Sequence, residues 1–216
     1  MYRSPLADGG TSTAGYNKVN ASSAISNNMR PLISAKQLCL KLIEQNVQPC
    51  CVNFWYNKFE LLLSEYHSLV AIKSTKEERL KLLHWKILHN IYPTNILLHK
   101  MGLRNSPNCS FCNENDYMEH FFWFCSKIKK VWTSCIDFIF AKTNRMITLT
   151  VTDALFGYCP EQINNKFVQL VNHIILIAKV VISKFKYGAQ YDINAMFLTE
   201  VEYRSNQIKS QLKFFG

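Results

Sequence analysis

Four residues within one short stretch constrain this chain more than any other feature of its sequence. Cys109 and Cys112 are separated by two residues, His120 follows after seven more, and Cys125 follows after a further four. Three thiolates and one imidazole are a ligand set that zinc binds in a tetrahedron, and two cysteines spaced in this way reach one ion from a single tight turn. His120 and Cys125 are five positions apart, so a helical turn brings them to neighbouring faces. The spacing therefore predicts a zinc site.

The surroundings of the motif support a structural rather than a catalytic metal. Residues of the turn-forming kind flank the first two cysteines, at 106–108 and at 113–116. Four protein ligands leave no open position on zinc for water or substrate. The competing interpretation is that these are ordinary buried thiols, because free cysteine is among the most buried residue types. The clustering of three of the eight cysteines with one of the six histidines favours the metal.

The composition indicates a folded chain that favours polyanionic partners. Hydrophobic residues make up 48% of the 216 residues and aromatic residues 13%, which is too apolar for a chain disordered throughout. The formal net charge of +10 favours nucleic acid or an acidic surface as partner, although basic proteins without such partners exist. No apolar run follows the positive charge at the N-terminus, so no signal peptide is expected. The cysteines are therefore expected to be reduced, in a cytoplasmic or nuclear protein.

The hydrophobic pattern predicts an all-α fold, an irregular helical bundle with a small zinc-binding loop module inserted between helices. Residues 1–34 are rich in small and polar residues and are expected to form a flexible leader. We expect N-terminal helices in residues 35–104, the zinc module and its following helix in 105–142, and a C-terminal helical segment in 143–216.

Individual helices are predicted from the spacing of apolar residues and from capping signals. Thr75 and Glu78 are spaced as a capping box, and Gly102 stands where a left-handed helix cap is expected. The β-branched residues at 146–151 favour a short extended segment. The predicted helices cover residues 35–47, 54–69, 75–91, 94–101, 128–139, 162–186 and 195–213.

Two further predictions concern polar residues in these helices. His84, His89 and His99 are expected on helix surfaces, solvated or bonded to backbone, without a functional role. The helix at 162–186 is apolar almost all round between 174 and 182. Polar residues interrupt it, and a membrane span needs about 20 predominantly apolar residues. It is therefore expected to be the central buried helix of a bundle and not a membrane span.

A group of basic residues lies close to the zinc motif. Lys127, Lys129 and Lys130 come directly after the last ligand, so a rigid zinc module would present them to a phosphate backbone. Lys100 and Arg104, before the motif, could add further phosphate contacts. The alternative is that these lysines form an ordinary solvated helix face.

Several of these segments together resemble a known family. The stretches are Leu80–Tyr92, Leu98–Leu103, the Cys109 to Cys125 motif, Ile128–Trp132 and Asn172–Lys179. They are similar to the C-terminal zinc-binding region of LINE-type retrotransposon reverse transcriptases. The resemblance covers roughly residues 52–213 and is most specific between 80 and 132. It implies a helical module that binds template RNA or target DNA beside the polymerase, with Cys109, Cys112, His120 and Cys125 at the ligand positions.

The motifs of catalysis are missing from the sequence. It contains no pair of adjacent aspartates of the polymerase kind, no phosphate-binding glycine loop, no nucleophile elbow and no H-E-x-x-H helix. We therefore expect a non-catalytic fragment of a larger reverse transcriptase. Two hypotheses remain: a nucleic-acid-binding zinc module, or a structural and protein-interaction domain in which zinc only holds helices together.

Overall fold

The structure is a computed structural model, and it describes residues 52–60, 70–160, 165–188, 192–204 and 208–209. Every described residue belongs to one unit of the chain, which spans residues 33–216. The predicted leader and the predicted helix at 35–47 lie outside the described residues. The predicted boundaries at 104 and 142 stay predictions.

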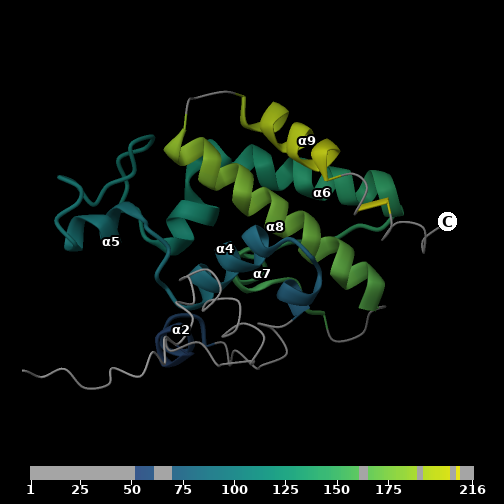
Figure 1. Cartoon of the computed structure of the whole chain (residues 1–216), viewed down its shortest axis with the longest axis horizontal. Coiled ribbons are helices and arrows are strands. Elements are labelled where there is room, and N and C mark those ends of the chain that lie inside the picture. The colour runs from purple at the N-terminus through teal and green to yellow at the C-terminus, as the bar shows by residue number, and fades with distance from the viewer. Residues whose placement is uncertain (1–51, 61–69, 161–164, 189–191, 205–207, 210–216) are drawn as a thin grey trace, which may run out of the picture. The chain divides into compact units, whose positions relative to one another are not determined.

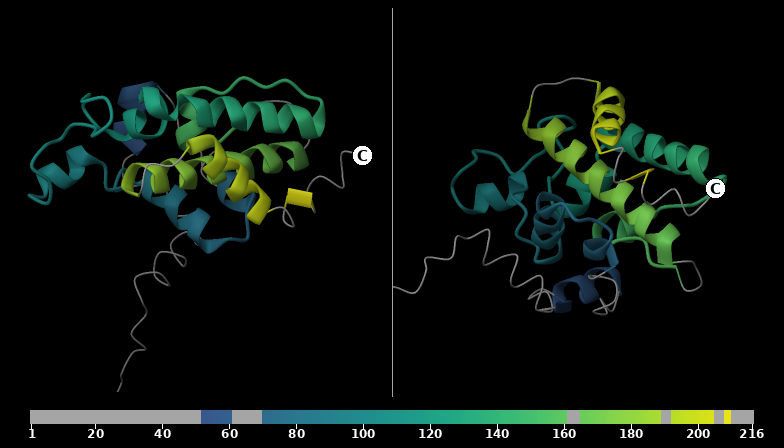
Figure 2. Two further views of the ribbon diagram at one scale, coloured as in Figure 1. Left: turned by 90° about the horizontal axis from the view of Figure 1, so that it is seen from above. Right: turned by 45° about the vertical axis from the view of Figure 1, so that its right-hand side comes forward.

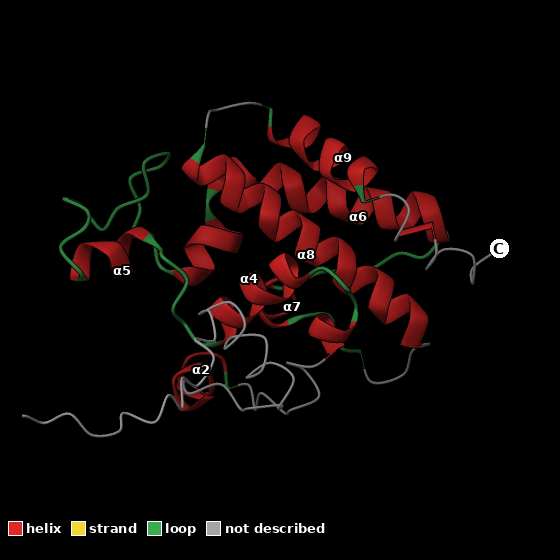
Figure 3. Cartoon of the chain, viewed as in Figure 1, coloured by secondary structure: helices red, strands yellow, loops and turns green. Residues whose placement is uncertain are grey.

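The described part of the chain is mostly helical and contains no β-strand, which confirms the predicted all-α class (Figures 1 and 3). A single antiparallel bridge, between Asn108 and Asn115, is the nearest approach to a sheet among these residues. The elements in order are α2 (Val52–Phe59), α4 (Glu78–Leu88), α5 (Asn95–Lys100), η1 (His120–Phe124), η2 (Ser126–Ile128), α6 (Lys129–Thr143), α7 (Val151–Phe156), α8 (Asn165–Tyr187) and α9 (Ile193–Tyr203).

Helix α8 is the element around which the others pack. It contacts α4, α6, α9 and η1, while α6 also contacts α9 and α4 contacts α7 (Figures 1 and 2). Its apolar side chains are buried on all sides between residues 174 and 182, as the sequence pattern predicts. By length and composition residues 166–187 could cross a membrane, but 83% of the most apolar 18-residue window is buried inside the protein. Burial of this extent is typical of a core helix.

The polar residues that interrupt α8 are themselves buried. Lys179 has no exposed surface, and its Nζ lies 3.0 Å from His84 Nδ1 and 3.0 Å from the carbonyl oxygen of Leu155. The prediction that His84 lies on a helix surface is therefore wrong, because its side chain turns into the core to meet a lysine 95 residues away. His99 agrees with its prediction, since its Nδ1 lies 2.9 Å from the backbone oxygen of Arg104.

A close contact fixes the connection between α7 and α8. Asn172 is fully buried on α8, where its Oδ1 accepts a hydrogen bond from the backbone N–H of Tyr158 and its Nδ2 donates to the oxygens of Tyr158 and Val168. Gly157 has a φ of +109°, and a Cβ at this position would lie 2.8 Å from Asn172 Oδ1. The turn at this glycine is thus a point of close packing.

The structure differs from the prediction at the start of one helix and at one segment that was predicted to be extended. The helix predicted to open at Thr75 begins later, because α4 begins at Glu78 and its N-cap is Glu77. The Thr75 hydroxyl accepts a hydrogen bond from the backbone N–H of Glu77, which forms a local turn before the helix. The segment 146–151 forms no strand and leads into α7, a helix that the sequence reading missed, although Thr150 and Asp153 form a full capping box there.

Three predicted helix ends also differ. Helix α2 ends at Phe59 because Glu60 adopts a left-handed conformation with a φ of 52°, and residues 61–69 lie outside the described part. Helix α4 ends at Leu88, so Ile91 falls beyond the helix and is 46% exposed instead of continuing the apolar stripe. Helix α9 ends at Tyr203; of the residues up to 213 that the predicted helix includes, 205–207 and 210–213 lie outside the described part, and 208–209 are helical.

Candidate metal centre

The first two cysteines lie on a tight turn that is closed by hydrogen bonds within its own backbone. The backbone N–H of Asn113 donates to the oxygen of Cys109 at 2.9 Å, and the N–H of Cys109 donates to the oxygen of Glu114 at 2.7 Å. Asn113 has a φ of 61°, a left-handed conformation that asparagine tolerates better than most residues. The turn therefore places Cys109 and Cys112 on one side of the loop.

The other two ligand candidates lie at the two ends of η1, a π-helical turn: His120 is its first residue, and Cys125 follows directly after its last. The expectation that an ordinary helical turn brings the pair to neighbouring faces is wrong, because residues five apart in a regular α-helix point about 140° away from each other. The wider turn is closed by the backbone N–H of Cys125, which donates to the oxygen of His120 at 3.1 Å. It brings His120 and Cys125 closer to the same side, and insertions of this kind are frequent at functional sites.

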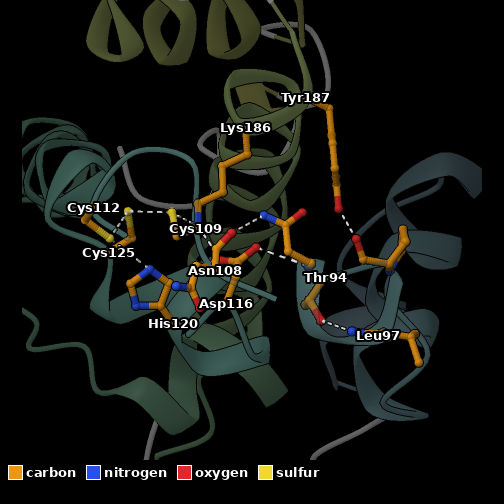
Figure 4. Close-up of polar contacts among 12 residues, drawn as sticks. Thr94, Leu97, Asn108, Cys109, Cys112, Asp116, His120, Cys125, Lys186 and Tyr187 are labelled. Carbon is orange, nitrogen blue, oxygen red and sulfur yellow. Dashed lines mark hydrogen bonds and ion pairs between the residues drawn. The ribbon is translucent and has the colours of Figure 1, made fainter. Parts of the chain in front are cut away.

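The four side chains meet at one point, where their ligand atoms all lie within 4.8 Å of one another (Figure 4). Cys125 Sγ lies 3.9 Å from Cys109 Sγ and 4.0 Å from Cys112 Sγ, and Cys112 Sγ lies 3.3 Å from His120 Nε2. Sulfur atoms about 2.3 Å from a tetrahedral zinc ion are about 3.8 Å apart. The cysteines are free thiols rather than disulfides. The cluster therefore fits a structural zinc ion.

Burial and the nearby charges shift the pKa values of three groups in the cluster, and not all in the same direction. Burial raises the pKa of the Cys125 thiol to about 12. Burial also raises the pKa of Cys109, but the backbone N–H of Phe111 and the nearby Lys186 outweigh it and hold that pKa below its ordinary value. Burial and then Lys186 lower the pKa of His120, which keeps the imidazole neutral as a zinc ligand requires.

Sequence reasoning missed two residues that contact this site, Lys186 and Asp116. Lys186 Nζ lies 2.9 Å from Asp116 Oδ1 and 3.5 Å from Cys109 Sγ, and the two side chains are 3% and 2% exposed. No local signal in the sequence could have paired them, because Lys186 is 77 positions from Cys109. Only the packing of α8 brings this lysine to the zinc loop (Figure 4).

The aromatic run between His120 and Cys125 divides between core and surface. Phe121 and Phe122 are fully buried and meet the ring of Tyr92 at centroid distances of 5.1 and 4.9 Å. Phe124 is 53% exposed. The two buried rings join the metal loop to the main hydrophobic core, because Tyr92, Phe121 and Phe122 all belong to that core.

The basic residues proposed for phosphate contact are all at the surface. Lys127 lies on η2, Lys129 and Lys130 begin α6, Lys100 ends α5, and Arg104 follows in the next loop. All five side chains are exposed. Ile128 and Val131, which alternate with the three lysines, are fully buried and fix this segment to the core.

Comparison with known proteins identifies the region that carries the cluster. No curated protein and no solved structure matches the chain. A family model described as zinc-binding in reverse transcriptase matches residues 46–132, which include all four ligands. This match confirms the resemblance to a reverse-transcriptase zinc-binding region. Residues 46–132 of this chain thus match the zinc-binding family of reverse transcriptases, and their Cys₃His cluster fits a structural zinc ion, in agreement with the zinc binding in the family description.

Proposed function

We propose that this chain is a non-catalytic, nucleic-acid-binding zinc module of a LINE-type reverse transcriptase, and that RNA or target DNA is its ligand. The observation that carries the proposal is the position of three exposed lysines, Lys127, Lys129 and Lys130, directly behind the zinc ligand Cys125. Phosphate contacts by lysine supply most of the sequence-independent affinity for nucleic acid.

The local structure favours such a contact. Helix α6 begins at Lys129 and has no acidic residue in its first turn. Backbone N–H groups at the start of a helix carry partial positive charge, which adds to the field of the lysines. Because Ile128 and Val131 anchor this turn in the core, the three lysines are held on a rigid support and their ordering costs less on binding.

A binding role suits the metal centre better than a catalytic one. Three cysteines and one histidine fill the tetrahedral positions of zinc, so a water molecule has no place to be activated. We propose that the catalytic groups belong to the polymerase portion of a larger protein, which acts beside this module in the cytoplasm or nucleus. We propose no membrane role for the chain.

The second candidate function is a structural one, in which zinc only holds helices together for contact with another protein. The contact between Lys186 and the zinc loop favours it, since the metal centre thereby joins α8 to residues far away in sequence. Under this hypothesis the basic surface is incidental and nucleic-acid binding at moderate ionic strength is negligible.

A salt titration with single-stranded RNA distinguishes the two candidates. The variant Lys127→Glu, Lys129→Glu, Lys130→Glu is compared with wild type by fluorescence anisotropy at several salt concentrations. Three lost phosphate contacts reduce the slope of log Kd against log salt by about 2, since each contact to a single strand contributes about 0.7. Zinc content is measured in parallel so that loss of the metal is not mistaken for loss of binding.

A matched charge reversal at a second group of exposed basic residues serves as the control. Lys73, Lys76 and Arg79 are exposed, and their replacement by glutamate changes the net charge by the same amount. The control variant is expected to keep most of the wild-type slope. Equal slopes for wild type and the 127/129/130 variant would show that these lysines are not the contact, and absence of RNA binding by the zinc-loaded wild type would favour the structural role.

A further inference from the structure

The last turn of α8 lies against the metal loop, although it is more than 50 positions beyond the end of the family match at residue 132. Phe185 stacks on Phe111, which lies between the first two cysteines, with ring centroids 5.0 Å apart and an interplanar angle of 16°. The Tyr187 hydroxyl donates to the backbone oxygen of Pro93, and its ring lies 5.6 Å from that of Phe121. Three consecutive residues of α8, Phe185, Lys186 and Tyr187, thus contact the metal loop or the segments packed beside it.

Lys186 is positioned as a hydrogen-bond donor to a zinc ligand. Its Nζ lies 3.5 Å from Cys109 Sγ, within reach of an N–H···S hydrogen bond, and 4.5 Å from the centre of the Phe121 ring. The side chain is 97% buried, so water cannot take over the contact. A long cationic side chain seldom becomes this buried unless a partner compensates for the lost hydration.

The charges of the centre explain why a cation belongs there. Three thiolates and one divalent ion leave a net charge of −1 when the histidine is neutral. Asp116, 2% exposed, adds a second negative charge within the same buried region. Lys186 is the cation that contacts both, which lowers the cost of holding the thiolates away from water.

Asp116 has contacts besides Lys186, so the ion pair alone does not account for this arrangement. Its Oδ2 lies 3.3 Å from the backbone nitrogen of Asn95, and its backbone N–H donates to the oxygen of Pro107 at 3.1 Å. Asn95 in turn donates from Nδ2 to the oxygen of Asn108, next to Cys109. Asp116 is thus held by α5 and by its own loop, and Lys186 adds a cationic donor to the Cys109 sulfur beside the backbone N–H of Phe111 (Figure 4).

We propose that Lys186 is a positioning residue of the zinc centre, which donates a hydrogen bond from Nζ to the Cys109 thiolate and completes the site from outside the matched region. Partners of this kind orient metal ligands and tune their donor strength, and their loss typically weakens metal binding 10–100-fold. The inference concerns zinc and does not depend on nucleic-acid binding.

The test replaces Lys186 in the full chain and measures the metal directly. Lys186→Met keeps the length of the side chain and removes the donor. We expect zinc affinity, measured by competition with a chelator, to fall about 10–100-fold. In the cobalt-substituted protein we expect the sulfur-to-cobalt charge-transfer bands to shift, because a thiolate without a hydrogen bond is a stronger donor. Lys184→Met is the control, since Lys184 lies two residues away on α8 and pairs with Glu200 instead.

A second variant separates the thiolate contact from the ion pair. Asp116→Asn removes the partner charge and leaves the Lys186 to Cys109 contact, so zinc affinity within about threefold of wild type and unshifted cobalt bands are expected. This variant carries the test by itself if Lys186→Met does not fold. The proposal is overturned if Lys186→Met and Lys184→Met bind zinc equally well, or if Asp116→Asn loses tenfold or more in affinity.

Discussion

Cys125 and Cys135 are both thiols without exposed surface, yet one belongs to the metal cluster and the other does not. Burial raises the pKa of each above its ordinary value. Their difference is one of geometry: the Cys125 sulfur lies 3.9 Å from that of Cys109, while Cys135 lies on the core face of α6 with other apolar side chains. This pair therefore offers a controlled test of the zinc site.

Replacing each of these cysteines by alanine should separate the metal from ordinary packing. Cys125→Ala is expected to reduce bound zinc from about one ion per chain to near zero and to unfold the loop, because zinc contributes on the order of 10 kcal/mol in small zinc modules. Cys135→Ala is expected to keep zinc and to lose about 1 kcal/mol of stability. Metal analysis and thermal unfolding check both. Full zinc occupancy in Cys125→Ala would contradict the assignment of the ligands.

At the scale of elements, the connection from α7 to α8 depends on one glycine and one asparagine. Gly157 combines a φ of +109° with the close approach of Asn172 Oδ1, and a Cβ there would also lie 3.0 Å from the Cβ of Ala71. Gly102, at the end of α5, has a φ of +71° but nothing within 4 Å of the corresponding position. At Gly157 a side chain would meet both a lack of space and an unfavourable positive φ, whereas at Gly102 it would meet the positive φ alone.

The two glycines should therefore differ in their tolerance of alanine. Gly102→Ala is expected to cost about 1–2 kcal/mol, the cost of a left-handed alanine. Gly157→Ala is expected to cost more, on the order of 3 kcal/mol or above, because the added methyl group also forces Asn172 away from its hydrogen bonds. Denaturant unfolding of the zinc-loaded proteins measures both. Equal losses would mean that α8 moves aside easily and that the close contact is unimportant.

At the scale of the whole described fold, Lys179 connects three helices. Its Nζ donates to His84 on α4 and to the oxygen of Leu155 on α7, while its own backbone belongs to α8. Burial lowers the pKa of Lys179 from 10.5 to about 7, and burial together with Lys179 lowers the pKa of His84 well below its ordinary value. Near neutral pH the buried lysine is therefore protonated in a smaller fraction of molecules than an exposed lysine is.

This lysine should give the protein a distinct pH dependence of stability. Between pH 7 and 10.5 the unfolded chain binds more protons at Lys179 than the folded chain does. The free energy of unfolding of wild type therefore rises with pH across this window, relative to Lys179→Met, by up to about 1.4 kcal/mol per pH unit. Below pH 7 the difference is constant, because both states are protonated.

Chemical unfolding of the two proteins at a series of pH values measures this difference. Lys142→Met, at an exposed position on α6, is the control and should follow the wild-type curve. Parallel curves for wild type and Lys179→Met from pH 7 to 10 would show that Lys179 stays charged in the folded protein.

Much of the arrangement could be predicted because it is encoded locally. Zinc coordination restricts the spacing of its ligands along the chain, so the sequence predicts Cys109, Cys112, His120 and Cys125 as a ligand set. The structure brings their ligand atoms together. Apolar periodicity likewise predicts which face of α6 is buried, since the same 3.6-residue repeat determines both the pattern and the helix surface. The ends of helices were predicted less accurately. Glu60 follows the last residue of α2 and Asn90 lies two residues after α4, and both adopt left-handed conformations, which residues other than glycine adopt only occasionally.

The sequence by itself determined the helical class, the four clustered zinc-ligand candidates and the burial of the central helix, because each depends on residues a few positions apart. Only the tertiary structure decided that His84 lies in the core beside Lys179, and that Lys186 reaches the Cys109 sulfur. These contacts join residues 95 and 77 positions apart. No periodic pattern encodes such a distance, because the packing of α8 against the zinc loop and α4 brings the partners together and removes them from water.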